Sequence, residues 1–192
     1  MKSNRLCTTL CIVLLTITTA SCIRKTGSNV GSSSASPTVA EVTFVNPLPK
    51  RNGSVNDYAN VFDDAATKRL DTVAAELLRN DAVEVAFLTV DSTGKETIAD
   101  YSLAIARDWN LGATNHRGML LVLAIKDRQW RLQVSNALLT ELPDKVTKEL
   151  GDQSVEFYKR GDYAGGVDRY MRALGARLKK TSANKTSTPA LQ

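Results

Sequence analysis

The stretch Arg117 to Ser135, RGMLLVLAIKDRQWRLQVS, constrains the fold more than any other part of the chain. Residues 119–125 are an unbroken apolar run, as in a strand buried on both faces. Residues 129–135 instead alternate, with Trp130, Leu132 and Val134 on one face and polar side chains on the other, which indicates a half-buried edge strand. The two strands flank a short polar turn, so they predict an antiparallel hairpin, although the turn lacks an Asn-Gly or Asp-Gly signature.

Two helices and a strand are predicted before this hairpin. Asp63 and Asp64 open a helix whose apolar residues follow the helical period: Leu70, Val73, Ala74, Leu77 and Leu78. Residues 83–90 are β-branched and aromatic enough to form a strand. Thr93 and Glu96 fit a capping box for a helix with Ile98, Tyr101, Ile105 and Trp109 on one face. Because β-α-β crossovers are almost always right-handed and parallel, strand 83–90 should run parallel to strand 118–125.

Two further helical segments follow the hairpin. Residues 138–157 place Val146, Leu150 and Phe157 inward, with Pro143 in an N-terminal turn. Residues 163–178 place a longer apolar set inward: Val167, Tyr170, Met171, Leu174 and Leu178. The order of elements predicts the α/β class. We expect a single three-layer α/β/α domain with a small mixed sheet, a β-α-β crossover plus an antiparallel hairpin, flanked by helices.

The N-terminal segment has the features of an export signal. Residues 1–21 combine a basic start with an apolar run too short to span a bilayer, which predicts a signal peptide. The small residues before Cys22 are similar to a bacterial lipobox, with Thr19 in place of the usual Leu; ordinary signal cleavage nearby is the alternative. We expect a lipid anchor and flexible linker over 22–53, the domain over 54–178, and a flexible basic tail over 179–192. The protein should be extracytoplasmic and membrane-anchored, on the periplasmic face or the cell surface.

Cysteine positions narrow the chemistry. Cys7 and Cys11 lie in the predicted leader, and Cys22 would carry the lipid. The predicted domain therefore has no thiol, which excludes disulfides, zinc–thiolate sites and cysteine nucleophiles from it. A diacyl anchor would supply two chains, enough for stable attachment to a membrane surface.

The positive charge of the chain lies mostly outside the predicted domain. Residues 54–178 contain 16 Lys and Arg against 19 Asp and Glu, a net charge of −3, whereas the flanks carry +8. Nucleic-acid-binding domains concentrate positive charge on the folded part. The distribution disfavours nucleic acid as a partner and favours contact between the basic flanks and anionic lipid headgroups.

Four segments of the chain resemble the TPM domain family. They are Val55-Asn56-Asp57-Tyr58-Ala59, Trp109-Asn110-Leu111-Gly112, Arg117-Gly118-Met119-Leu120-Leu121 and Lys159-Arg160-Gly161-Asp162-Tyr163, in the order that the family has. The resemblance covers about 125 of the 192 residues. It implies an exported or membrane-attached α/β/α domain. Family members have been linked to phosphatase activity, to calcium binding, and to the assembly or repair of membrane protein complexes.

The predicted topology brings several polar residues to one edge of the sheet. The end of helix 96–109, the start of strand 118–125 and the end of strand 129–135 should meet there. These elements would group Trp109, Gly112, His116, Arg117, Ser135 and Asn136, with Asp57 as an additional candidate. The resemblance implies acids and an Asn at this edge, where this chain has His116-Arg117 and Ser135-Asn136. The change removes a hard oxygen ligand and adds positive charge, so the calcium site implied by the family is degraded here. The sequence indicates no other cofactor.

Each candidate residue also has a purely structural interpretation. His116 can be a solvated loop residue, and Trp109 can belong to the core. Asp57 can close a turn before a helix, and Asp144 can be a first-turn carboxylate favoured by the helix dipole. The loop 91–95 can bind an anion or simply cap the next helix. No catalytic residue is identified.

Two functions remain open at this point. The first is a binding or assembly module for membrane or envelope proteins, with Trp109, His116, Arg117 and Asn136 as its contact surface. The alternative is a metal-assisted phosphomonoester hydrolase that uses Asp57 and Asp144 as metal ligands. The chain lacks a phosphate-binding Gly-rich loop, a dinucleotide fingerprint, a His metal cluster and a Gly-x-Ser-x-Gly elbow. The sequence therefore favours the binding module.

Overall fold

Four strands form one sheet in the order β1-β2-β3-β4 in the computed structural model, which describes residues 47–186. The strands are β1 (Val55–Asp57), β2 (Glu84–Val90), β3 (Gly118–Ala124) and β4 (Gln129–Val134). β1, β2 and β3 run parallel, and β4 pairs antiparallel with β3. The predicted crossover and hairpin are both confirmed.

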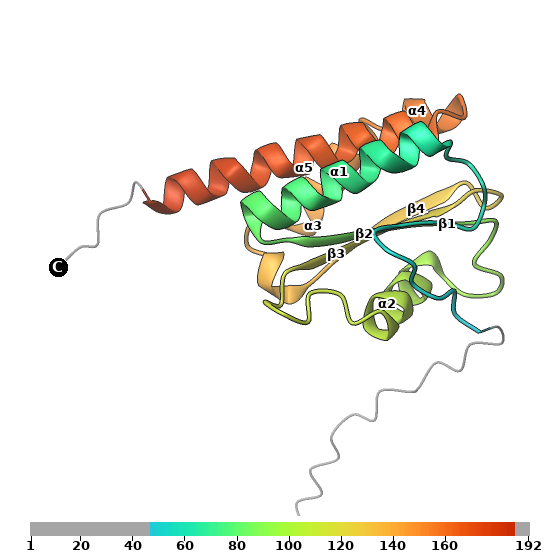
Figure 1. The fold of residues 1–192 in the computed structure, drawn as a ribbon, viewed down its shortest axis with the longest axis horizontal. Helices are drawn as coiled ribbons and strands as arrows, with labels where there is room; N and C mark the ends of the chain where they lie inside the picture. Colours follow the sequence, from blue (N-terminus) through green and yellow to red (C-terminus); the bar gives the residue numbers. More distant parts are fainter. Residues whose placement is uncertain (1–46, 187–192) are drawn as a thin grey trace, which may run out of the picture. The chain divides into compact units, whose positions relative to one another are not determined.

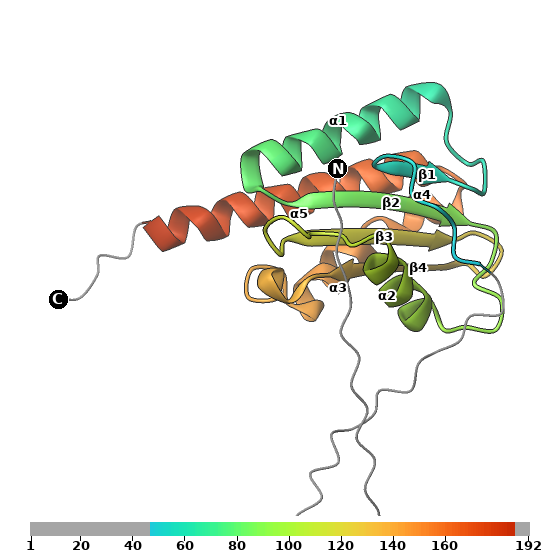
Figure 2. The same ribbon diagram turned by 60° about the horizontal axis from the view of Figure 1, so that its bottom comes forward.

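Helices cover both faces of this sheet (Figures 1 and 2). They are α1 (Asp64–Asp81), α2 (Ile98–Asp108), α3 (Asp144–Asp152), α4 (Val155–Lys159) and α5 (Tyr163–Thr186), with a short 3-10 turn, η1 (Asn136–Leu138). α1 and α5 lie side by side on one face, and α2 covers the opposite face. This is the three-layer α/β/α arrangement that the sequence predicts.

Alternation along the central strands divides the core into two layers. On the α1/α5 side, Phe87 and Leu121 pack with Leu70 of α1 and Met171 of α5. On the α2 side, the intervening strand residues pack against Ile105 and Trp109: Ala86, Leu88, Leu120, Val122 and Ala124. Every residue of β3 is buried, as expected of a strand covered on both faces. The two layers fix α2 relative to the ends of β3 and β4.

Two boundaries and the burial of one side chain differ from the sequence predictions. α2 begins after Thr97, whose side chain accepts a hydrogen bond from the Asp100 N–H, so the cap is four residues later than the predicted Thr93. Leu78 of α1 is 53% exposed, because the helix face that it shares with Arg79 turns away from the sheet. The predicted helix 138–157 is divided into η1, α3 and α4, and Pro143 is the N-cap of α3.

α5 is longer than predicted. It continues through Thr186, so residues 179–186 of the predicted flexible tail are helical. The hydroxyls of Thr181 and Ser182 donate to the carbonyls of Arg177 and Leu178, one turn earlier in the helix. The predicted leader, Cys22 and most of the linker lie outside the described residues.

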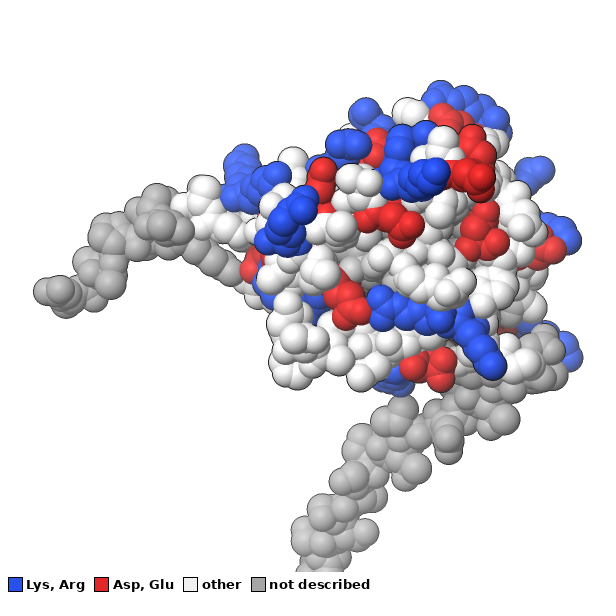
Figure 3. Space-filling view, viewed as in Figure 1, with Lys and Arg blue, Asp and Glu red and all other residues white. Residues whose placement is uncertain are grey.

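β1 was not predicted as a strand, since it has three residues and only one is apolar. Its Asn56 is buried, and the side-chain amide donates to the Phe87 carbonyl of β2 at 3.2 Å, which holds β1 against the sheet. On the face shown in Figure 3, Lys and Arg side chains lie interspersed with Asp and Glu. Within residues 47–186, no helix is both long and apolar enough to cross a membrane.

Candidate functional site

The amino-terminal ends of β2 and β3 meet the carboxy-terminal end of β4 at one edge of the sheet, because Glu84 pairs with Gly118 and Met119 pairs with Val134. The loop between α2 and β3 turns back tightly here. A Cβ on Gly118 would lie 2.7 Å from the Leu111 carbonyl carbon, so only glycine permits this approach. The Gly112 N–H donates to the Glu84 carboxylate at 2.8 Å, which ties the loop to β2.

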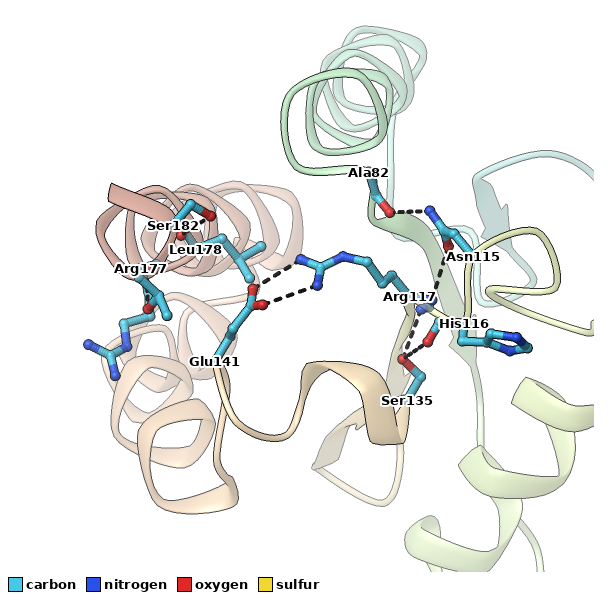
Figure 4. Close-up of polar contacts among 11 residues, drawn as sticks. Ala82, Asn115, His116, Arg117, Ser135, Glu141, Arg177, Leu178 and Ser182 are labelled. Atoms are coloured by element: carbon cyan, nitrogen blue, oxygen red, sulfur yellow. Dashed lines mark hydrogen bonds and ion pairs between the residues drawn. The ribbon is translucent and has the colours of Figure 1, made fainter. Parts of the chain in front are cut away.

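Ser135 connects the two strands at this edge (Figure 4). Its hydroxyl donates to the His116 carbonyl at 2.6 Å and accepts from the Gly118 N–H at 3.0 Å. Asn115 extends the network, since its oxygen accepts from the Arg117 N–H and its amide donates to the Ala82 carbonyl at the end of α1. The predicted grouping of His116, Arg117, Ser135 and Gly112 at one edge is therefore observed.

Arg117 and His116 point to opposite sides of the sheet (Figure 4). Arg117 extends toward α5 and forms a two-bond ion pair with Glu141, at 3.1 and 3.0 Å. The side chain of Glu141 is 7% exposed and that of Arg117 is 22% exposed. Arg117 is thus a half-buried, neutralised cation, whereas the sequence placed it on the predicted contact surface.

His116 is exposed and points to the side of the sheet where α2 lies. Its backbone is in the left-handed region, with φ of 61°, which is uncommon for a residue other than glycine. The hydrogen bond from its N–H to the Gly112 carbonyl, at 2.6 Å, closes this turn. The imidazole is therefore held out from the sheet edge by the loop's own backbone.

A groove of 410 Å³ lies on this same side, between α2 and the end of β4, which we call the α2–β4 groove. Its apolar part comes from Leu103, Leu111 and Leu120. In the part of the chain that the structure describes, its polar lining has one cation, several amides and no carboxylate: Arg107, Asn110, Gln133 and Asn136. Arg107, Asn110 and Asn136 are exposed. This lining supplies hydrogen-bond donors around an apolar floor.

Two of the predicted site residues do not belong to this surface. Trp109 is only 7% exposed, and its indole N–H donates to the Pro49 carbonyl at 2.9 Å, so its core interpretation is correct. Asp57 lies at the opposite edge, because it pairs with Thr89 at the carboxy-terminal end of β2. Its carboxylate accepts from the N–H groups of Val61 and Phe62 and from the Thr89 hydroxyl, which closes the turn into α1.

The predicted metal pair, Asp57 and Asp144, is not brought together. Asp144 opens α3 three residues after Glu141, which is paired with Arg117 at the other edge of the sheet from Asp57. Among the described residues, no three His, Cys, Asp or Glu side chains come together in a group that could hold a metal ion. The residues at the His116 edge do not fit calcium, which requires several oxygen ligands, because the carboxylates of Glu84 and Glu141 are already paired with Arg51 and Arg117.

Ionisation near this edge is affected by burial. Burial raises the pKa of Asp81 above its ordinary value, while the nearby Lys179 and Arg117 act in the opposite direction. Asp81 is the last residue of α1, where the helix dipole also disfavours a negative charge. The charged form of this carboxyl is therefore disfavoured in the folded protein, and Asp81 does not line the α2–β4 groove.

Sequence reasoning missed Glu141 and Arg107. Glu141 is one acid among apolar neighbours, and the only signal was that an acid in such a segment needs a partner when buried. Arg107 lies on the polar face of α2, a position at which the sequence indicates only an ordinary solvated residue. The alternation that places Gln133 of β4 and Ser135, the residue after it, on one face did indicate a polar face, and that face lines the groove.

The fold and this edge define a three-layer α/β domain with a mixed four-stranded sheet. A family model described as the TPM domain matches residues 55–177. The chain therefore belongs to the TPM domain family, as the sequence resemblance suggested. No curated protein matches the chain.

Solved structures share the fold. The N-terminal domain of a protein from P. gingivalis, solved by solution NMR, is 26% identical with a TM-score of 0.61, over 66% of this chain and 82% of that chain. The N-terminal domain of the cg2496 protein from Corynebacterium glutamicum is 14% identical, with a TM-score of 0.52 over 78% and 93%. The BA42 protein from Bizionia argentinensis is 14% identical, with a TM-score of 0.56 over 62% and 82%. The latter two show similarity of fold alone.

Proposed function

We propose that this TPM domain is a binding module whose contact surface is the α2–β4 groove together with His116. The observation that carries the proposal is the lining of the groove, where an apolar floor is surrounded by Arg107 and by the amides of Gln133 and Asn136. Such a mixture of apolar area, arginine and uncharged donors suits contact with another protein. Backbone carbonyls and acidic side chains of a partner segment would satisfy these donors.

The Arg117–Glu141 pair supports the choice of side. Because Arg117 is directed toward α5 and neutralised, it does not add charge to the α2 side. The available groups at this edge are then His116 and Asn136, both exposed, and the groove beside them. The contact surface differs from the initial prediction in that it omits Trp109 and Arg117 and gains Arg107.

The proposal places the module at a membrane. A lipid at Cys22 would hold the domain at the extracytoplasmic surface, and residues 23–53 would allow it to reach an envelope protein. The partner is then a membrane or envelope protein that presents a carbonyl-rich or acidic segment.

A photo-crosslinking amino acid placed at Asn136 of the full chain tests this function in native membranes. We expect one discrete adduct from this position and none from Asp71, an exposed residue of α1 on the other helical layer. A double change, Arg107→Ala with Asn136→Ala, should abolish capture of the same partner by tagged protein. Its melting temperature should stay near that of the wild type, since exposed substitutions of this kind usually change stability by under about 0.5 kcal/mol.

Two outcomes would contradict the proposal. Equal adducts from Asp71 and Asn136 would show that the crosslinks are not specific to the groove. Undiminished capture by the double variant would show that the partner binds elsewhere. The phosphatase alternative is not favoured, because Asp57 and Asp144 lie at opposite edges of the sheet.

A further inference from the structure

A second hollow lies at the opposite edge of the sheet, between the β3–β4 turn and the junction of α4 and α5. Its volume is 620 Å³, compared with 410 Å³ for the α2–β4 groove. Pockets of about 300–1,000 Å³ accommodate small-molecule ligands. Leu123, near the carboxy-terminal end of β3, and Ile125, just after that strand, contribute to the apolar part of its lining. We call this hollow the hairpin pocket.

Aromatic side chains form much of its wall and are fixed by their own packing. Trp130 meets Tyr170 edge-on, with ring centroids 5.5 Å apart and planes at 78°. A Cβ on Gly151 would collide with the Trp130 ring, so α3 can lie against the indole only because this residue is glycine. Tyr158 stacks on Tyr163 with centroids 6.2 Å apart. The wall is therefore preformed and needs little ordering when a ligand binds.

Three cationic residues line the same pocket: Arg128, Lys159 and Arg160. Among the described residues that line it, none is an Asp or a Glu. Arg128 is exposed, and the structure shows no hydrogen bond or ion pair from its guanidinium to any residue in the described range. Lys159 pairs with Glu156, and Arg160 pairs with Asp162 while lying 4.0 Å from the centre of the Phe157 ring. Exposed ion pairs of this kind are weak, so both cations can turn to a bound anion.

The acids of the neighbouring turn are engaged elsewhere. The Asp127 carboxylate accepts from the Thr93 N–H at 2.8 Å, and this bond, with one from Ser92, holds the pKa of Asp127 below its usual value. Asp91 pairs with Lys126 at 2.8 Å. These contacts hold Asp91 and Asp127 on the side of the 91–97 loop. Because Lys159 and Arg160 are each paired with one acid, Arg128 is the lining cation that no acid of the described residues neutralises, and it makes the mouth of the hairpin pocket positive.

We propose that the hairpin pocket binds an amphiphilic anion, that is, an apolar body that ends in a phosphate or carboxylate group. The apolar body would lie on Leu123, Ile125 and the aromatic wall, and the anionic end would meet Arg128 with Lys159 or Arg160. Arginine and lysine bind such oxyanions through charge-assisted hydrogen bonds. This site is independent of the proposed contact with a protein partner at the other edge.

Four probes separate the contributions of the apolar body and the charge: octyl phosphate, octanoate, octyl glucoside and inorganic phosphate, with the three amphiphiles kept below their critical micelle concentrations. They are titrated into the full chain while the two indole N–H signals are followed by NMR. The Trp130 signal should shift with octyl phosphate and octanoate, and the Trp109 signal should stay, because Trp109 is buried on the α2 side. Octyl glucoside and inorganic phosphate should bind at least ten-fold more weakly than octyl phosphate. Equal binding of octyl glucoside and octyl phosphate would overturn the proposal.

Charge variants locate the site. Arg128→Gln with Arg160→Gln should weaken octyl phosphate binding at least ten-fold without changing the weak binding of octyl glucoside. Lys126→Gln is the matched control, because Lys126 is an exposed cation of the same turn but does not line the pocket. Unchanged circular dichroism and melting temperature would show that both variants fold. An equal loss of affinity in the control would overturn the assignment to this pocket.

Vesicles distinguish a lipid headgroup from a soluble ligand. Wild-type and Arg128→Gln/Arg160→Gln chains, both carrying Cys22→Ala so that no lipid anchor contributes, are compared by flotation on phosphatidylglycerol and on phosphatidylcholine vesicles. An excess of wild type on phosphatidylglycerol alone would identify a lipid as the anion. Equal flotation of the two chains, with octyl phosphate binding still lost in the variant, would assign the pocket to a soluble amphiphile. Equal flotation together with unaltered octyl phosphate binding would overturn the proposal.

Discussion

The guanidinium of Arg117 and the carboxylate of Glu141 join the start of β3 to the segment before α3 through two parallel hydrogen bonds of 3.1 and 3.0 Å. This pair accounts for the opposite directions of two neighbouring side chains at this edge. Arg117 points toward α5, where Glu141 binds it, and His116 points toward α2. The Nε of Arg117 is buried and has no hydrogen-bond partner within residues 47–186, so the two bonds to Glu141 are what offsets the cost of burying this side chain.

Removing one partner should therefore be costly. We expect Glu141→Gln and Arg117→Met each to lower the free energy of unfolding by about 1–3 kcal/mol, because each leaves a partly buried polar group without its charged partner. The double variant should lose clearly less than the sum of the two. Urea unfolding of the four chains measures this, and strict additivity would show that the pair contributes no coupling. A loss of stability in the Arg117 variant would also mean that Arg117→Ala is unsuitable as a probe of surface binding.

Ala82 ends α1 in the left-handed conformation, with φ of 53°. Glycine adopts this conformation without the steric conflict of a Cβ, so Ala82→Gly should raise the free energy of unfolding by about 0.5–1 kcal/mol. Ala75→Gly is the matched control, since Ala75 is exposed within the same helix. It should lower stability by about 1 kcal/mol. Denaturant midpoints compare the two, and a loss of stability in Ala82→Gly would contradict the role of the cap.

Protonation of the Asp81 carboxyl should make the folded protein more stable as the pH falls. Burial raises its pKa in the folded state, so the folded chain binds more protons than the unfolded chain between the ordinary value, about 3.9, and the raised value. Stability from this group is therefore lost as pH rises through that window. Asp81→Asn should stabilise the protein at pH 7 by about 0.3–1 kcal/mol, the usual effect of a charge at a helix end. The advantage over wild type should shrink toward pH 4 in urea titrations, and an advantage that grows on acidification would be inconsistent with this assignment.

Cys22 determines location in the proposed function. Cys22→Ala should move the protein from the membrane fraction to the soluble extracytoplasmic fraction, because no lipid can be attached. Fractionation with immunoblotting measures this, and Cys11→Ala is the control, since Cys11 lies in the predicted leader. Retention of the Cys22→Ala protein on membranes at the wild-type level would rule out the lipid tether.

Asp57 tests the phosphatase alternative. Its carboxylate accepts hydrogen bonds from Val61 and Phe62, so Asp57→Asn should lower the free energy of unfolding by about 1–2 kcal/mol through lost charge-assisted bonds. Neither wild type nor variant should hydrolyse an aryl phosphate in calcium or magnesium. Metal-dependent turnover by the wild type that is lost in a folded Asp57→Asn chain would instead favour the hydrolase over the binding module.

The central sheet could be predicted because its signals are local and redundant. The apolar run of β3 and the alternation of β4 each identify one strand, and the intervening helix determines the parallel direction. β1 was missed because Asn56 is held by a hydrogen bond to Phe87, 31 residues away, which no local pattern records. The later start of α2 was missed because Thr93 and Thr97 offer equivalent caps, and the Thr93 N–H is used by Asp127 of the hairpin turn.

The candidate site was predictable only at the level of the sheet edge. Topology brought His116, Arg117 and Ser135 together correctly, but the direction of each side chain depends on partners distant in sequence. Glu141 binds Arg117 and holds it away from the α2 side, and the Pro49 carbonyl accepts a hydrogen bond from the Trp109 indole N–H. The placement of Asp57 was wrong because its strand pairs with the carboxy-terminal half of β2, a register that the sequence did not reveal.

The two ends of the described chain are fixed to different layers. Leu48 packs against the α2 layer, whereas α5 lies on the other face and projects beyond the sheet (Figure 1). With a rise of 1.5 Å per residue, its last eight residues, 179–186, add about 12 Å of helix. Tension between the two ends would therefore pass through the whole thickness of the domain, first across the Trp109 contact and then along α5.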